Sequence, residues 1–259
     1  MGGTIITGLL VAGWGPDRVI AADKDKVRAD ALHELHGIHA ATDAAKAVNG
    51  ADVVVIAVKP QDVGDTLDAI AGSVSDDALI LSVAAGIPTA FFESRLGDSQ
   101  AVVRAMPNTP AIVGRGATAI AAGQHATEDH LNTVAAVLRA TGLIVRVDED
   151  KLGAVTALSG SGPAYFYVLE EALTEAGVEQ GLDRLMATQL AAQTFVGAAH
   201  LLEQSGDTPQ TLRKKVSSPG GTTIAALQAM DKAGILDVVK SGAAAAAQRA
   251  IEMSDEYGS

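Results

Sequence analysis

The chain has 259 residues, of which 48% are hydrophobic and only 3% aromatic, so its core must be built mainly from Ala, Val, Leu and Ile. Such hydrophobicity excludes a mainly disordered chain. Thirty-one acidic residues against nineteen basic ones give a net charge of −12, which argues against nucleic acid as a partner, because that partner needs a basic surface. The absence of cysteine excludes disulfides, thiolate metal sites and cysteine nucleophiles, and it suits a cytoplasmic protein.

No apolar run approaches the ~20 residues that a membrane-spanning helix needs. The longest strongly hydrophobic run, Val53 to Val58, has the length of a strand. The N-terminal residues, Met1 to Ile6, lack the basic head and cleavage site of a signal peptide. We therefore expect a cytoplasmic protein with no membrane contact.

The first part of the chain alternates short apolar runs with amphipathic ones, which is typical of βα units and a parallel sheet. The run from Val53 to Val58 is apolar at every position, as expected of a strand covered on both faces. Expected strands span 19–22, 38–41, 53–58, 78–83, 102–106, 117–121 and 143–147. Expected helices span 26–36, 43–48, 63–70 and 127–140.

From Lys151 onward only helices are expected, over 165–176, 182–204, 208–216, 223–232 and 236–256. The change of class predicts two domains, 1–150 and 151–259. The helix around Leu190 to Leu202 carries little charge on several faces and must be buried. A domain of about 110 residues has too little interior to bury so many faces, so the pattern predicts a homo-oligomer with interdigitating helices.

The segment from Val216 to Leu227 is a glycine-rich turn that leads into a helix. The helix presents an apolar face of Ile224, Leu227 and Met230. Backbone N–H groups at such a helix start form a cradle for an anion. Hydroxyl groups that can join it belong to Ser218, Thr222 and Thr223. An ordinary capped turn explains the same residues equally well on physical grounds.

This segment resembles the signature of the pyrroline-5-carboxylate reductases. Three further blocks resemble the same family in the same order: Ala57 to Pro60, Arg104 to Pro110 and Leu158 to Tyr165. The four blocks together span essentially the whole chain. The resemblance implies a Rossmann-like α/β domain with a parallel sheet, followed by an all-α dimerisation domain. It also implies reduction of 1-pyrroline-5-carboxylate to L-proline by hydride transfer from NADPH or NADH, the last step of proline biosynthesis.

The resemblance assigns roles to individual residues. Candidate catalytic residues are Thr223, Ser218 and Lys59, with the Thr223 hydroxyl bonded to the ring nitrogen or carboxylate of the substrate. Gly220, Gly221 and Thr222 would hold that carboxylate, and a turn with Ser159 and Ser161 would shape the pocket wall. A protonated imine is already electrophilic, so the protein needs mainly to orient the reactants. The lack of an obvious catalytic His or Cys agrees with this undemanding chemistry.

The expected cofactor-binding residues are Gly2, Asp23, Lys24, Ala57, Val58, Lys59, Pro60 and Asn108. Lys59 follows the clearest strand, at the carboxyl edge where parallel sheets bind ligands, and the match of Ala57 to Pro60 favours this role over that of an ordinary surface lysine. Asp23 ends a strand where an acid binds the adenosine ribose and favours NADH, whereas Lys24 and Arg28 would accept the 2′-phosphate of NADPH. The sequence leaves this choice open. Asn108 fits a turn before Pro110 equally well.

The chain departs from its family at the N-terminus. A dinucleotide site begins with a strand that runs into Gly-x-Gly-x-x-Gly, and the resemblance places Gly2 at the third glycine, with a helix over 4–12. The first strand belongs in the middle of the sheet, so without it neighbouring strands are left with unpaired backbone groups. Either the true start lies about 10–15 residues upstream or the chain is truncated, with weakened cofactor binding. We expect the former, since the other blocks are intact.

Two other functions stay open on the sequence. One is a related Rossmann-plus-helical dehydrogenase of another imino or hydroxy acid, and the other is a cofactor-deficient, non-catalytic oligomerising homologue. No metal is expected: His33 and His36 are separated from His39 by Gly37, a predicted helix C-cap, so the three side chains diverge. The assembly is expected to be a dimer or a ring of dimers.

Overall fold

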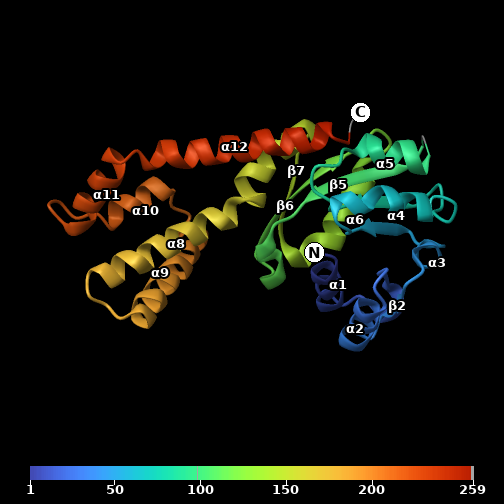
Figure 1. Ribbon diagram of the computed structural model, residues 1–259, viewed down its shortest axis with the longest axis horizontal. Coiled ribbons are helices and arrows are strands. Elements are labelled where there is room, and N and C mark those ends of the chain that lie inside the picture. The colour runs from blue at the N-terminus through green and yellow to red at the C-terminus, as the bar shows by residue number, and fades with distance from the viewer. Residues whose placement is uncertain (98, 258–259) are drawn as a thin grey trace. The chain divides into compact units, whose positions relative to one another are not determined.

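A computed structural model describes residues 1–97 and 99–257. The described chain forms two compact units. The first contains Met1–Ser161 together with the C-terminal segment from Ala245, and the second is Gly162–Ala244. Figure 1 shows a mixed α/β architecture in the first unit and helices alone in the second. The change from α/β to helical structure follows the last strand, which ends at Arg146.

Within the described residues, the strands of the first unit form two sheets. A two-stranded parallel sheet contains β1 (Ile20–Ala22) and β2 (His39–Ala41). A five-stranded sheet contains, in spatial order, β3 (Val53–Ile56), β4 (Leu79–Ser82), β5 (Ala101–Met106), β6 (Gly116–Ala122) and β7 (Gly142–Arg146). All neighbours in it are parallel except β5 and β6. Those two are antiparallel because a short link with one 3-10 helix (Thr109–Val113) joins them, and parallel strands need a longer crossover.

The break between the two sheets lies between β1 and β3. A doubly wound dinucleotide fold has the strand order 3-2-1-4-5-6. Here β2 and β1 take the places of strands 3 and 2, and β3, β4 and β5 take those of strands 4, 5 and 6. No strand pairing joins β1 to β3 in the described part of the chain. The break therefore falls at the place of the first strand, as the sequence predicts.

Burial beside the break differs from burial in the middle of the sheet. Ile20 on β1 is 49% exposed, and Val53 and Val55 on β3 are half-buried. All four residues of β4 are buried. The expectation of a strand over 53–58 covered on both faces was thus wrong at Val53 and Val55, since among the described strands β3 has a neighbour on one edge only. It was also wrong at Ala57 and Val58, because the strand ends at Ile56 and Val58 is exposed.

The five-stranded sheet carries a core on each face. Successive strand side chains point to opposite faces, so Leu79 and Leu81 join one cluster and Ile80 the other. The first cluster also takes buried residues from α1 (Gly2–Val11) and α6 (Glu128–Leu138). The second takes them from α4 (Val63–Ile70) and α5 (Thr89–Leu96). Both faces are thus covered by helices.

Local signals explain the bounds of the helices around β1 and β2. The Asp25 carboxylate accepts a hydrogen bond from the N–H of Val27 at the start of α2 (Lys26–His36). Gly37 ends that helix in a left-handed conformation, with φ of 67°, which glycine adopts without strain. Asp43 caps α3 (Ala44–Val48) through the N–H of Lys46. Each cap lies where the sequence predicts a helix end.

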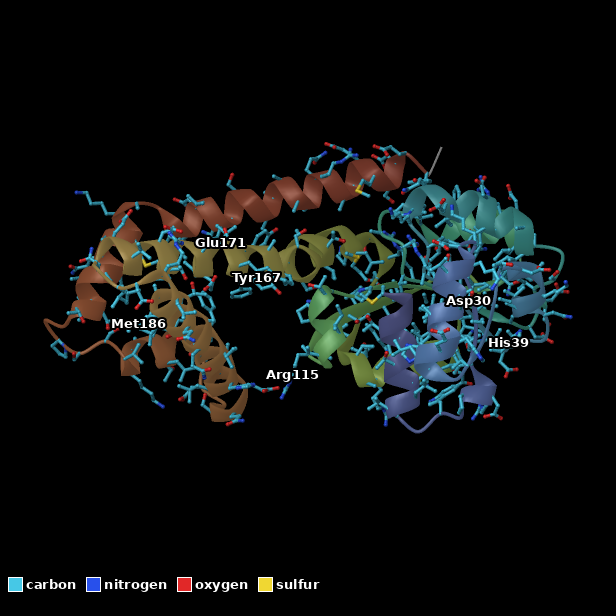
Figure 2. The ribbon with its side chains drawn as sticks, turned by 60° about the horizontal axis from the view of Figure 1, so that its bottom comes forward. Asp30, His39, Arg115, Tyr167, Glu171 and Met186 are labelled. Atoms are coloured by element: carbon cyan, nitrogen blue, oxygen red, sulfur yellow. The ribbon has the colours of Figure 1, made fainter. Side chains whose placement is uncertain are left out.

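The second unit is built from helices. These are α8 (Gly162–Glu179), α9 (Arg184–Ser205), α10 (Pro209–Lys215), α11 (Thr222–Lys232) and the first part of α12 (Ile235–Asp255). Along its 22 residues α9 buries only Ala187 and Ala191. Tyr167 and Met186, labelled in Figure 2, are 61% and 47% exposed. So much exposed apolar surface in one chain marks an association surface. None of the described helices is long and apolar enough to cross a membrane.

Candidate active site

The start of α1 lies against the end of β3. A Cβ atom added to Gly2 would come within 3.3 Å of the Ala57 Cβ, so glycine permits this close approach. No side chain caps α1, and its first backbone bond runs from the Ile5 N–H to the Met1 carbonyl at 3.1 Å. The preceding amides have no acceptor within the helix, which makes this end a site for an anion. The geometry fits the pyrophosphate of a dinucleotide.

Charged side chains gather at the end of β1. Asp23 Oδ1 accepts a hydrogen bond from the Asp25 N–H at 2.9 Å. Lys24 Nζ lies 2.7 Å from Asp62 Oδ1, and Arg28 Nε lies 3.6 Å from Asp25 Oδ2. The hydrogen bond that Lys24 donates to Asp62 is the main cause that raises the pKa of Lys24. Each cation that the sequence offers to a 2′-phosphate is therefore paired with a carboxylate.

Lys59 lies at the carboxyl edge of the five-stranded sheet. Its carbonyl accepts a hydrogen bond from the Asp62 N–H at 2.9 Å, and Pro60 opens the short 3-10 helix Pro60–Asp62. Val58 and Lys59 are exposed. Among the described residues the Lys59 ammonium has no hydrogen bond or ion pair. It is available to an anion at this edge.

Asn108 joins two sequence blocks that lie far apart along the chain. Its Oδ1 accepts a hydrogen bond from the Ala117 N–H at 2.9 Å, and its Nδ2 donates to the Ser159 carbonyl at 3.0 Å. The local turn is also present, since the Asn108 carbonyl accepts the Ala111 N–H at 3.2 Å, but the side chain does not cap it. A Cβ on Gly160 would come within 2.6 Å of Met106 Cε, so the same two blocks also pack closely there.

The turn that Asn108 holds is a π-helical segment, Thr156–Gly160, which follows α7 (Leu152–Val155). Its closing bond runs from the Ser161 N–H to the Thr156 carbonyl at 2.7 Å. The Ser159 hydroxyl donates to the Val155 carbonyl at 3.1 Å, and Ser161 is half-buried. Single π-turns occur frequently at functional sites. The predicted wall residues Ser159 and Ser161 thus lie on an irregular, anchored turn.

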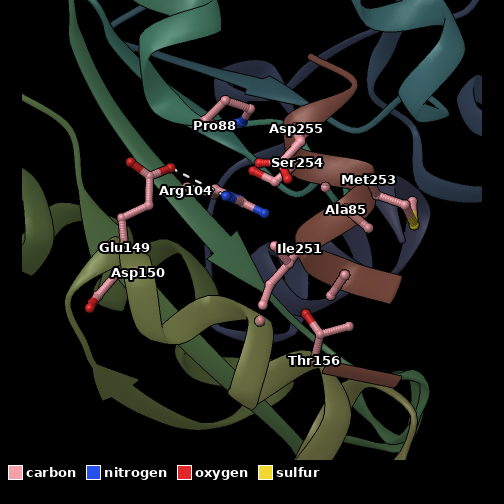
Figure 3. A pocket seen from close by; sticks show the side chains of 13 residues that line it. Ala85, Pro88, Arg104, Glu149, Asp150, Thr156, Ile251, Met253, Ser254 and Asp255 are labelled. Carbon is pink, nitrogen blue, oxygen red and sulfur yellow. Dashed lines mark hydrogen bonds and ion pairs between the residues drawn. The ribbon is translucent and has the colours of Figure 1, made fainter. Parts of the chain in front are cut away.

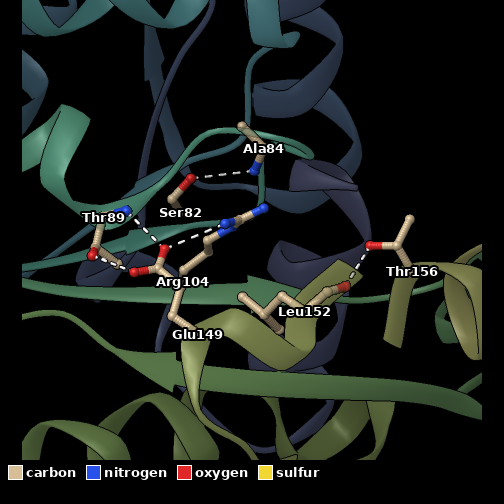
Figure 4. A network of polar contacts seen from close by, with 7 residues as sticks. All are labelled: Ser82, Ala84, Thr89, Arg104, Glu149, Leu152 and Thr156. Carbon is tan, nitrogen blue, oxygen red and sulfur yellow. Dashed lines mark hydrogen bonds and ion pairs between the residues drawn. The ribbon is translucent and has the colours of Figure 1, made fainter. Parts of the chain in front are cut away.

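A buried ion pair supports the strand that leads to Asn108. Arg104 is 7% exposed, and its Nη1 lies 3.3 Å from Glu149 Oε1. Figure 4 shows the Glu149 carboxylate also accepting hydrogen bonds from the Thr89 N–H at 2.8 Å and the Thr89 hydroxyl at 2.7 Å. Burial lowers the pKa of Arg104 below its usual value, and the charge and hydrogen bond of Glu149 oppose this shift without cancelling it. The sequence analysis gave these residues no role, although an arginine in an apolar strand signals a buried partner.

The Arg104 guanidinium points into a pocket of about 360 Å³ in the first unit. Figure 3 shows its walls: Pro88 and Glu149 on one side, and Ile251, Met253 and Ser254 of α12 on another. Through Glu149 the ion pair links β5 to Thr89 at the start of α5, and residues at the end of α12 line the pocket beside it.

The glycine-rich block of the second unit forms a type II turn. The Gly221 N–H donates to the Ser218 carbonyl at 2.9 Å, Pro219 takes the second position, and Gly220 has φ of 70° at the third. A Cβ on Gly221 would lie 2.6 Å from the Ser218 Oγ, so glycine is needed there as well.

The last residue of the turn, Gly221, directly precedes α11. Gly221 occupies the N-cap position, and no side chain caps the helix. The first backbone bond runs from the Ala225 N–H to the Gly221 carbonyl at 3.4 Å. The amides of Thr222 and Thr223 precede it and have no acceptor within the helix. Thr223 is half-buried and Thr222 exposed. The structure thus gathers the predicted substrate-binding residues of this block around an uncapped helix start.

The candidate residues divide between the two units. The first unit carries Gly2, Asp23, Lys24, Ala57, Val58, Lys59, Pro60, Asn108, Ser159 and Ser161. The second carries Ser218, Gly220, Gly221, Thr222 and Thr223. No group of three His, Asp or Glu side chains suited to a metal ion occurs among the residues described.

Comparison with known proteins supplies the family. The family model for pyrroline-5-carboxylate reductase dimerisation matches residues 149–253, and that for coenzyme F420-dependent NADP oxidoreductases matches residues 1–86. The pyrroline-5-carboxylate reductase of Mycobacterium tuberculosis (strain H37Rv) is 41% identical over 276 residues, covering 98% of this chain and 93% of the relative. The chain belongs to the pyrroline-5-carboxylate reductase family.

Solved structures of this reductase family share the fold. A pyrroline-5-carboxylate reductase from Coxiella burnetii matches with a TM-score of 0.92 and 35% identity, covering 98% of this chain and 94% of the other. The reductase of Plasmodium falciparum, solved with NADP bound, matches with a TM-score of 0.85 and 26% identity over the same shares. The Rossmann-like domain followed by a helical dimerisation domain, predicted from the sequence, is confirmed.

Proposed function

We propose that this protein reduces 1-pyrroline-5-carboxylate to L-proline with NADPH or NADH, the last step of proline biosynthesis. The observation that carries the proposal is the type II turn Ser218–Gly221. It leads directly into the uncapped start of α11, where Thr222 and Thr223 lie. A cyclic imine acid has one carboxylate to anchor and one ring nitrogen to orient, and this block offers amides for the first and a hydroxyl for the second. Membership of the reductase family supports the same reaction.

We assign the roles as follows. The backbone of Gly220, Gly221 and Thr222 binds the substrate carboxylate, and the Thr223 hydroxyl bonds to the ring nitrogen, so that the imine carbon is held in one orientation. Ser218 supplies a second hydroxyl beside the turn, and Ser159 and Ser161 shape the pocket wall. A bound reduced nicotinamide supplies the hydride that converts the C=N bond into a C–N bond. Lys59 places a positive charge near the anionic reactants.

For the nucleotide, the uncapped start of α1 at Gly2 binds the pyrophosphate, and Asp23 and Lys24 meet the adenosine ribose. Ala57, Val58, Lys59 and Pro60 line the carboxyl edge of β3, where a nucleotide crosses a doubly wound sheet. Asn108 lies at the equivalent end of β5. We propose that residues 1–150 bind the nucleotide, while residues 151–259 bind the substrate and mediate self-association.

The assembly is proposed to be a dimer or a ring of dimers, joined through the exposed apolar faces of α8 and α9. The net charge of −12 supports the absence of nucleic-acid partners. The lack of cysteine supports a cytoplasmic location, where disulfides are rare.

The test is oxidation of NADH or NADPH by purified protein supplied with 1-pyrroline-5-carboxylate. Thr223→Val removes the hydroxyl at nearly constant volume and is expected to lower kcat/KM by about 10- to 100-fold, the value of a hydrogen bond to a charged group. Thr223→Ser keeps the hydroxyl and is expected to retain most of the activity. No imine-dependent oxidation by the unaltered protein contradicts the function, whereas equal losses in both variants contradict the role of the hydroxyl.

A further inference from the structure

We propose that Asp23 determines the nucleotide specificity of this enzyme: it binds the ribose hydroxyls of the adenosine and, with Asp62, disfavours a 2′-phosphate, so that NADH is used more efficiently than NADPH. The inference rests on the proposed function, which needs a nicotinamide nucleotide without deciding which one.

The position of Asp23 is that of a ribose-binding acid. It follows β1 directly, about 20 residues after Gly2 at the start of α1, where dinucleotide folds place a carboxylate on the ribose 2′-hydroxyl. The Asp25 N–H donates to Asp23 Oδ1 at 2.9 Å and fixes the carboxylate, which is half-buried. Oδ2 has no partner among the described residues and is available to a ribose hydroxyl.

The cations beside Asp23 are already paired. Lys24 Nζ lies 2.7 Å from Asp62 Oδ1, Arg28 Nε lies 3.6 Å from Asp25 Oδ2, and Lys26 Nζ lies 2.7 Å from a carboxylate oxygen of Asp30. One of the first amides of α2 is occupied too, because the Asp25 carboxylate accepts the N–H of Val27. A 2′-phosphate would therefore compete with a carboxylate for each of these cations.

The local field favours the hydroxyl over the phosphate. The pKa of Lys24 is raised by its hydrogen bond to Asp62 and further by the charges of Asp65 and Asp23, so three acids act on the Lys24 ammonium at the end of β1. Exposed ion pairs are individually weak, and Lys24 is able to leave Asp62. It would then leave the Asp62 carboxylate unpaired beside a phosphate that brings nearly two negative charges. A ribose hydroxyl meets no such repulsion and donates to Asp23.

The first experiment measures binding without substrate, from the fluorescence of NADH and NADPH titrated against the protein. Three variants remove one negative charge each at nearly constant shape: Asp23→Asn, Asp62→Asn and Asp76→Asn. Asp23→Asn keeps the acceptor for the Asp25 N–H, and Asp62→Asn releases Lys24. Asp76 is an exposed acid between α4 and β4, at the opposite end of the strands, and serves as the matched control.

The unaltered protein is expected to bind NADH more tightly than NADPH. Asp23→Asn and Asp62→Asn are each expected to shift the ratio of the two affinities toward NADPH by about tenfold, the value of one nearby charge in a partly screened site. Asp76→Asn is expected to leave the ratio unchanged. Tighter binding of NADPH by the unaltered protein, or an unchanged ratio in both site variants, overturns the inference.

A second measurement separates the inference from the function on which it rests. Values of kcat/KM for both nucleotides with 1-pyrroline-5-carboxylate are expected to follow the affinities. If both nucleotides are oxidised and the ratio is the same in all variants, the specificity role fails while the function stands. If neither nucleotide is oxidised, the function and the specificity role fall together.

Discussion

Among the described residues Arg104 is the only charged residue that is buried. Glu149 is the acid that compensates its charge. Removing Glu149 would leave the guanidinium in the core without a counter-charge. We therefore expect Glu149→Ala to lower the free energy of unfolding by about 2–4 kcal/mol, since breaking a buried pair leaves an uncompensated charge. Urea denaturation of the variant measures this loss.

The reverse substitution is the control. Arg104→Met keeps most of the volume, and Glu149 then retains its hydrogen bonds from Thr89 and its 28% exposure to water. We expect this variant to lose less stability than Glu149→Ala. An equal or larger loss in Arg104→Met would show that packing, rather than charge compensation, dominates at this position.

Asn108 shows how far a sequence block predicts a role. Its block predicted a polar group at the end of a strand, and the structure places it there. The bond to the Ser159 carbonyl spans 51 residues and follows from no local pattern. The same holds for Glu149, which lies 45 residues from Arg104. The type of a residue and its place at the end of a strand can be read from the local sequence. Its hydrogen-bond partner far along the chain depends on how the whole chain packs.

The hairpin of α8 and α9 is joined by an exposed ion pair with favourable geometry. Arg184 donates from Nη1 to Glu175 Oε1 at 2.6 Å and from Nη2 to Oε2 at 2.9 Å. The hydrogen bond from Arg184 lowers the pKa of Glu175 below its usual value. A depressed carboxyl pKa contributes stability above the pKa of the unfolded chain, and this contribution is lost as the pH falls through the folded value.

We expect Glu175→Gln to lower the Tm at neutral pH by about one to three degrees, as for an exposed pair with bidentate geometry. The difference from the unaltered protein should shrink as the pH falls below the usual Glu pKa and vanish only below the lowered folded value, where the carboxylate is protonated in both states. Glu171→Gln, on the same helix and labelled in Figure 2, is the control and should change the Tm little. A difference that persists at low pH would contradict the ionic origin.

The elements that were predicted best are those with strong local signals. The expected helices 26–36 and 63–70 match α2 and α4 residue for residue, because caps and apolar spacing define them. The helix α5 was missed: it is only eight residues long, and the sequence analysis assigned no element to residues 89–96. The antiparallel direction of β6 also escaped prediction, since a strand's own pattern carries no information on its neighbour.

At the scale of the whole molecule, the aromatic-poor composition and the exposed helices belong together. Because the chain has few aromatic residues, the core of the first unit is built from many aliphatic side chains packed between the sheet and the helices. The second unit instead leaves large apolar residues of α8 and α9 exposed in a single chain. The dimerisation family model over residues 149–253 accounts for that exposure, because a second copy would cover it.

At the break between β1 and β3, strand edges and apolar side chains of the first unit lack the covering that the middle of the sheet has. Each strand has one edge without a partner strand, and Ile20, Val53 and Val55 are less buried than residues of β4. An apolar strand placed between them would gain backbone hydrogen bonds on both sides. Its carboxyl end would meet the start of α1, where a Gly-x-Gly turn adds amides for the pyrophosphate.

We therefore expect a protein extended before Met1 by an apolar strand of about 10–15 residues ending in Gly-x-Gly to be more stable and to bind NAD(P)H at least about tenfold more tightly. Thermal unfolding and nucleotide fluorescence measure the two effects. An extension of equal length made of Gly and Ser is the control, because it can neither fill the break nor cover Ile20. If both extensions give the same Tm and the same affinity, the break between β1 and β3 is not a place for a strand. The two readouts are coupled by the fold, since the turn that binds the pyrophosphate is positioned only when the strand before it is paired.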